Sequence, residues 1–168
     1  KASTENQPAP TAPEVYQRAL DLLKDGKSDK ALTELNKAIR LDKRFVDALT
    51  TRANVYLARG EFDRALKDFD SVIRADPRRP AGYMQRGQVL MQLELYDDAL
   101  EDFEEAVLLG GDDAEVYLHR GSARGFTSDL VGALADFNEA LRRKPDYALA
   151  YQRRGDMLGM MNQPHKAL

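Results

Sequence analysis

The feature that most constrains the fold is a period of 34 residues that runs through almost the whole chain. Alanines recur at this spacing, each followed by leucine, and arginines followed by a small residue recur in the same register. The two ladders are Ala31, Ala65, Ala99, Ala133 and Ala167, and Arg18, Arg52, Arg86, Arg120 and Arg154. Self-similarity at a fixed period is typical of stacked copies of one supersecondary unit that bury a continuous core together. The sequence therefore predicts a repeat array.

Each unit contains two stretches with helical periodicity. In the third unit one apolar face consists of Tyr83, Gly87 and Leu90, and a second consists of Ala99, Phe103 and Ala106. Turn-like segments separate the two stretches, and Pro77 and Pro145 follow the second stretch of units two and four. Each unit is predicted to be helix–turn–helix. Gly87 costs about 1 kcal/mol relative to Ala in a helix interior, and we expect close packing of the paired helices to offset that cost.

The pattern resembles the tetratricopeptide repeat family. Counting from Ala12, Val46, Pro80, Ala114 and Ala148, small residues hold places 8, 20 and 27, an aromatic holds place 24 in repeats two to four, and Pro holds place 32 in repeats two and four. The resemblance covers four complete repeats (12–45, 46–79, 80–113 and 114–147) and a truncated fifth (148–168). It implies an all-α, right-handed superhelical solenoid of antiparallel helix pairs. Lys43, Arg124 and Ser128 depart from the pattern.

Both ends of the chain differ from the repeats. Residues 1–13 contain three prolines without apolar periodicity, so we expect a flexible linker there. The fifth unit stops just inside its second helix, whereas repeat arrays usually cover their last apolar face. Two explanations are open: the native protein continues, or this end pairs with another chain.

The arginine ladder has two interpretations, an acidic-ligand site or a structural device. An acid recurs 16 residues after each Arg in the complete units, immediately before the place-24 residue. An antiparallel pair of helices can bring the two side chains together, with the Arg stem along the core edge and its planar fork on the carboxylate. We favour structural ion pairs, and the predicted members are Arg52, Asp68, Arg86, Asp102, Arg120 and Asp136.

The family resemblance also implies a binding surface. In this family the first helices of successive repeats line a concave groove, and the matching places here carry amides, thioethers and few charges. The candidate ligand-binding residues are Asn54, Met84, Gln85, Gln88, Leu118, His119, Ser122, Gln152 and Arg153. Amides can donate to and accept from a peptide backbone, and Met adapts to irregular apolar side chains. The chaperone-binding branch needs Lys at place 5, where this chain has Tyr16, Thr50 and Met84, so chaperone-tail binding is not expected.

Composition excludes several functions. The chain has no cysteine, only two histidines far apart in sequence, no phosphate-binding loop and no Ser/His/Asp arrangement, so we expect no enzyme, metal site or cofactor. The 25 basic and 28 acidic residues are interspersed, which disfavours nucleic acid as a partner. No apolar run approaches the ~20 residues that span a bilayer, so no membrane insertion is expected.

The predicted function is a protein–protein interaction scaffold or adaptor that binds a peptide or extended protein segment in the groove. The alternative is an assembly module that self-associates through its terminal helix faces. A helical-repeat RNA binder is a weaker alternative. The sequence indicates no cellular compartment.

Overall fold

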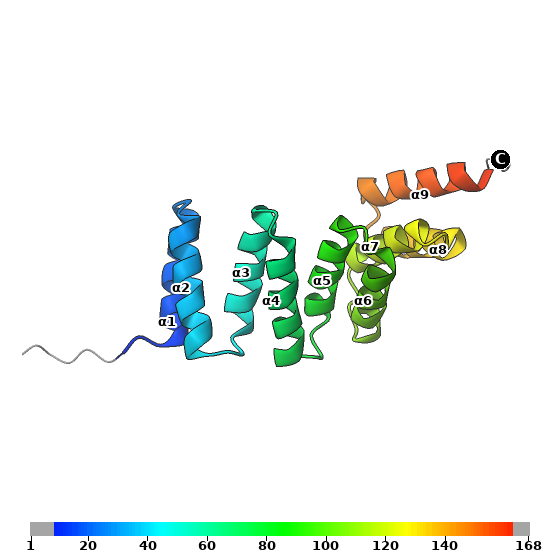
Figure 1. The fold of residues 1–168 in the computed structure, drawn as a ribbon. Coiled ribbons are helices and arrows are strands. Elements are labelled where there is room, and N and C mark those ends of the chain that lie inside the picture. Colours follow the sequence, from blue (N-terminus) through cyan, green and yellow to red (C-terminus); the bar gives the residue numbers. More distant parts are fainter. Residues whose placement is uncertain (1–8, 163–168) are drawn as a thin grey trace, which may run out of the picture. The chain divides into compact units, whose positions relative to one another are not determined.

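The computed structural model describes residues 9–162, and every regular element within this range is an α-helix (Figure 1). The helices are α1 (Ala12–Lys24), α2 (Ser28–Leu41), α3 (Val46–Ala58), α4 (Phe62–Ala75), α5 (Pro80–Gln92), α6 (Tyr96–Leu108), α7 (Ala114–Phe126), α8 (Leu130–Arg143) and α9 (Ala148–Asn162). The all-α prediction is confirmed. None of the helices in this range is long and apolar enough to cross a membrane.

The helix boundaries follow the sequence period. The odd-numbered helices, which we call the first helices, begin 34 residues apart, at the five positions predicted to open the repeats. Helix α1 begins at Ala12 and has Glu14 accepting a hydrogen bond from the backbone N–H of Thr11 at 2.8 Å, so the last two residues of the expected linker are helical. Residues 1–8, which form most of that linker, and residues 163–168 of the fifth repeat lie outside the described residues.

The turn inside each complete repeat requires a left-handed residue at place 15. Gly26 and Gly60 hold it in the first two repeats with φ of 73° and 72°. Glu94 and Ser128 hold it in the next two with φ of 61° and 69°. Glycine adopts this region without steric cost, whereas other residues pay about 1–2 kcal/mol. Ser128, which departs from the family pattern, and Glu94 therefore both occupy a strained backbone position.

The helices group into two compact units, one ending at Ala75 and the other starting at Asp76. In the first unit α1 packs on α2, α2 on α3 and α3 on α4. One core cluster here consists of Val15, Ala19, Leu35, Ala38, Ala48 and Val55. In the second unit α5 to α9 pack in the same sequential way, and a core cluster consists of Leu118, Ala133, Phe137, Ala140, Leu141 and Ala150.

Glycine at place 8 allows the second helix to lie close to the first. A Cβ atom built on Gly87 would lie 2.8 Å from Cε1 of Phe103, and one on Gly121 would lie 2.8 Å from Cε1 of Phe137. Both rings are almost wholly buried. The hydrogen of glycine thus leaves the space that the place-24 ring of the same repeat occupies, and burial of the ring offsets the helix cost of the glycine.

Candidate functional site

The first helices of the second unit are neighbours in space as well as in the repeat. Helix α5 contacts α7, and α7 contacts α9. Their successive turns place residues of the predicted groove side by side within this unit. Of these, Met84, Gln85, Gln88, His119 and Ser122 are half-buried, and Gln152 and Arg153 are exposed.

A polar cluster joins α5 to α7. The side-chain amide nitrogen of Gln88 lies 2.9 Å from Nε2 of His119 and 3.3 Å from Oε1 of Glu115. The imidazole ring is stacked on the ring of Phe103, with 5.6 Å between centroids. Burial lowers the pKa of His119 below its ordinary 6.5, so the ring is neutral at pH 7. Nε2 of His119 also lies 3.6 Å from Oε1 of Glu115, so the Gln88 amide and the Glu115 carboxylate both face this nitrogen.

An apolar pocket of about 100 Å³ lies between α7 and α9, next to this cluster along α7. Its lining residues are Ser122, Gly125, Phe126, Phe137, Arg153, Met157 and Met160. The Ser122 hydroxyl donates to the carbonyl of Leu118 at 2.9 Å, so the lone pairs of its oxygen are left to accept a hydrogen bond. The arrangement can take an apolar side chain beside one cationic group.

Two of the predicted groove residues lie elsewhere. Leu118 is 2% exposed and belongs to the core cluster of the second unit, so its side chain packs against α8 and is not available to a ligand. Our assignment of Leu118 to the groove is therefore wrong. Packing against α8 removes this leucine side chain from water, although it lies at a groove place of the family. Asn54 is exposed on α3, in the first unit.

The arginine ladder forms buried, bidentate ion pairs between the two helices of a repeat. In each pair Nε and Nη2 of the arginine donate to the two carboxylate oxygens, at 2.8–2.9 Å and 2.6 Å. The pairs are Arg52 with Asp68, Arg86 with Asp102, and Arg120 with Asp136. The three aspartates are only 3–5% exposed. Hydrogen bonding to Asp68 raises the pKa of Arg52, and hydrogen bonding to Asp136 raises that of Arg120.

The same arginine place also links consecutive repeats. Nη1 of Arg52 donates to Oδ1 of Asn36 at 2.6 Å, and Nη1 of Arg154 donates to Oδ1 of Asn138 at 2.9 Å. In each case the acceptor lies on the second helix of the preceding repeat. The ladder thus cross-links helices within and between repeats, which is a structural role and leaves the guanidinium groups occupied.

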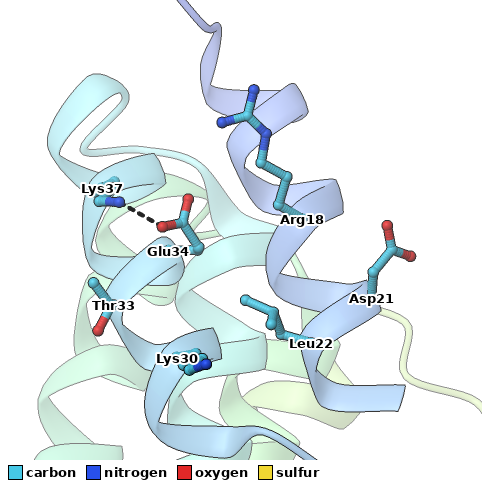
Figure 2. Close-up of a pocket in the computed structure, with 7 residues that line it drawn as sticks. All are labelled: Arg18, Asp21, Leu22, Lys30, Thr33, Glu34 and Lys37. Carbon is cyan, nitrogen blue, oxygen red and sulfur yellow. Dashed lines mark hydrogen bonds and ion pairs between the residues drawn. The ribbon is translucent and has the colours of Figure 1, made fainter. Parts of the chain in front are cut away.

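The first repeat differs from this arrangement. Figure 2 shows the guanidinium of Arg18 directed away from Glu34, whose carboxylate accepts from Nζ of Lys37 at 2.5 Å. These side chains border an open pocket of about 540 Å³ between α1 and α2, together with Asp21, Leu22, Lys30 and Thr33. Three cations and two acids line it, so the pocket has no strong preference for either sign of charge.

The predicted binding residues included two of the seven that line the apolar pocket, Ser122 and Arg153, and left out Gly125, Phe126, Phe137, Met157 and Met160. The Phe137 ring, at place 24 of the fourth repeat, is almost fully buried and also contributes to the pocket lining. A signal was present in the sequence: place 12 of the first helix carries Leu57 and Met91 in the second and third repeats but Gly125 in the fourth. A missing side chain at a groove place predicts a hollow there.

Comparison with known proteins identifies the repeat. The family model described as tetratricopeptide repeat matches three overlapping segments, residues 16–80, 50–116 and 84–148. The chain belongs to the tetratricopeptide repeat family. Among curated proteins no match was found.

Solved tetratricopeptide repeat structures share the fold. MamA from Desulfovibrio magneticus RS-1 is 23% identical, with a TM-score of 0.82 over 89% of this chain and 85% of that one. YrrB, described as a tetratricopeptide repeat protein with an unusual peptide-binding site, is 26% identical, with a TM-score of 0.79 over 94% and 81%. The second such domain of human RPAP3, solved with an HSP70 peptide, is 25% identical, with a TM-score of 0.63 over 66% and 92%. The predicted tetratricopeptide-like solenoid is confirmed.

Proposed function

We propose that this protein is a protein–protein interaction scaffold that binds an extended peptide segment on the first-helix face of its second unit. The observation that carries the proposal is the Gln88–His119 hydrogen bond beside an apolar pocket on the same row of helices. Extended peptides present backbone N–H and C=O groups between alternating side chains, and amides together with apolar hollows match that pattern. Gln85, Gln152 and Met84 belong to the same face.

The fold relatives support this proposal. YrrB is described with a peptide-binding site, and the human RPAP3 domain was solved with a bound peptide. Because function resides in sites and not in folds, peptide binding by this chain depends on its own residues. Those residues are mostly uncharged, so we expect modest affinity, with Kd of about 1 μM, which corresponds to about −8 kcal/mol.

A peptide library tests the proposal directly. The wild-type protein is incubated with a synthetic library of random hexapeptides, acetylated at the N-terminus and amidated at the C-terminus, and retained sequences are identified and remeasured by fluorescence anisotropy. The test variant replaces Gln85, Gln88 and His119 with Ala, and we expect it to lose most of the binding. A control variant replaces three exposed residues of second helices, Asp98, Glu101 and Arg142, with Ala.

The controls separate loss of binding from loss of fold. Both triple variants must retain the helical circular dichroism of the wild type. If the wild type retains no peptide, or if the test and control variants bind retained peptides equally, the groove proposal is wrong.

A second candidate function, self-association, has its own supporting observation on α9. Leu149, Tyr151 and Leu158 are 41–49% exposed. A Cβ atom built on Gly155 would meet nothing within 4 Å among the described residues, whereas Gly87 is covered by a phenylalanine ring. We propose that this face can accept a helix of a second copy. Sedimentation equilibrium at increasing concentration tests it: association that Tyr151→Lys abolishes supports this role, and a monomer at all concentrations refutes it.

A further inference from the structure

The apolar pocket of the second unit exists because one groove place lacks a side chain. At place 12, Leu57 and Met91 fill the position in the second and third repeats, and Gly125 leaves it vacant in the fourth. A Cβ atom built on Gly125 would lie 3.1 Å from Sδ of Met157, so the thioether of the neighbouring repeat packs against Gly125. The pocket is thus enclosed by α7 and α9 together.

The walls of the pocket are apolar and adaptable. Phe126 and Met160 are 56% and 54% exposed, although both contribute to the pocket lining, and Phe137 lies almost fully buried beside them. Thioethers adjust to irregular aliphatic shapes, and exposed apolar walls gain when a ligand removes them from water. A volume of about 100 Å³ has room for one aliphatic side chain.

Arg153 is the one charged residue among those that line this pocket. Arg153 is exposed and contributes to the lining, and no ion pair joins it to any residue between 9 and 162. Other arginines of the second unit are engaged: Arg120 and Arg124 contact Asp136, and Arg143 contacts Glu139. The neighbouring His119 is neutral and is hydrogen-bonded to Gln88. The pocket therefore pairs an apolar hollow with an uncompensated cation.

We infer that the Gly125 pocket selects a peptide segment in which an aliphatic side chain adjoins an Asp or Glu residue. The aliphatic group enters between Phe126 and Met157, and the side-chain carboxylate meets the Arg153 guanidinium. This inference rests on the proposed groove function and specifies its ligand. The carboxylate comes from a side chain because the amide cluster at Gln88 lies on the neighbouring helix of the same face, so the peptide main chain continues past the pocket to reach it.

The end-blocked hexapeptide library tests the charge of Arg153 and the hollow at Gly125 separately, through two further variants. Arg153→Gln removes the charge and keeps an amide of similar length. Gly125→Leu fills the hollow with the residue that the second repeat carries at that place, and leucine is also the better helix former. Arg142→Gln on α8 is the matched charge control, since its side chain is 69% exposed and does not line the pocket.

We expect the wild type to enrich aliphatic residues next to Asp or Glu. Arg153→Gln should lose the acidic preference and weaken the best peptide about 1.5- to 5-fold, while it keeps the aliphatic preference. Gly125→Leu should lose the aliphatic preference and weaken the same peptide by about 10-fold or more. Arg142→Gln should match the wild type.

Three results would overturn the inference. One is a set of peptides that depends on Gln88 and His119 but shows no aliphatic or acidic preference, which would leave the groove function intact. Another is a preference that neither Arg153→Gln nor Gly125→Leu changes. The third is binding restricted to peptides with a free C-terminal carboxylate in a parallel unblocked library. Absence of any bound peptide would refute the groove function as well.

Discussion

Loss of the Asp136 carboxylate should be among the most destabilising single changes in the second unit. Asp136 is 3% exposed and accepts three hydrogen bonds, two from Arg120 at 2.6 and 2.9 Å and one from Arg124 at 3.0 Å. In Asp136→Ala the two guanidinium groups remain near each other with that counter-charge removed. Losing one partner of a buried ion pair costs about 3–5 kcal/mol.

Partial exposure of the two arginines lowers this cost. The side chains of Arg120 and Arg124 retain 15% and 21% exposure, so water can partly solvate the abandoned charges. We therefore expect Asp136→Ala to lower the free energy of unfolding by about 2–4 kcal/mol. Replacing Arg120 and Asp136 together with Leu should cost less than the sum of the two single changes, because Arg120 is removed with its partner and Arg124 still pairs with Glu104.

Urea unfolding followed by circular dichroism measures these differences, with the m-value checked for constancy. Arg142→Ala is the control, because its pair with Glu139 is largely in solvent and should contribute far less. A loss below about 1 kcal/mol for Asp136→Ala, or additive single and double variants, would show that the arginine ladder does not stabilise the fold. The ligand interpretation of the ladder would then return.

Three further predictions address other features. Glu94→Gly should raise the free energy of unfolding by about 0.5–1 kcal/mol by relieving the positive φ, whereas Glu94→Ala should not, as urea unfolding would show. Gly87→Ala should change the free energy of unfolding by about 1 kcal/mol or less, because the second repeat already combines Ala53 with a buried place-24 phenylalanine. Gly87→Leu should cost at least about 2 kcal/mol, because the larger side chain clashes with Phe103. The pKa of His119 is lowered in the folded state, so the unfolded chain takes up the proton first and the free energy of unfolding falls as pH drops below about 6.5. The urea midpoint of the wild type should therefore fall more between pH 7.5 and about 5.5 than the midpoint of His119→Gln. Equal falls for the two proteins would contradict this.

Much of the helical framework could be predicted from the sequence. The first helices begin at the five positions given by the 34-residue ladders, because apolar residues recur at helical spacing in the same register of every unit. The spacing of 16 residues from Arg to Asp also predicted the three ion pairs, since an antiparallel pair of helices joined by a short turn brings such places together. Even the positive φ at place 15 has a sequence counterpart in the glycines of the first two repeats.

The residues of the candidate binding surface could not all be predicted from the repeat register, because their exposure depends on tertiary contacts. Place 5 is a groove place in the family, yet Leu118 is buried because an apolar side chain at the edge of a face turns toward whichever neighbour removes it from water. Arg18 and Glu34 have the ladder spacing but are not joined, since Lys37 lies one turn away on the same helix as Glu34 and contacts its carboxylate.

The sequence by itself therefore determined the period, the helix pairing and the ion pairs, which depend on residues a fixed distance apart along the chain. Only the tertiary structure decided where a hollow lies and what borders it. The pocket at Gly125 is made by Met157 and Arg153 of the next repeat together with Phe137 of the other helix. Its shape depends on how neighbouring repeats pack against each other, and close packing transmits the size of every side chain at that contact.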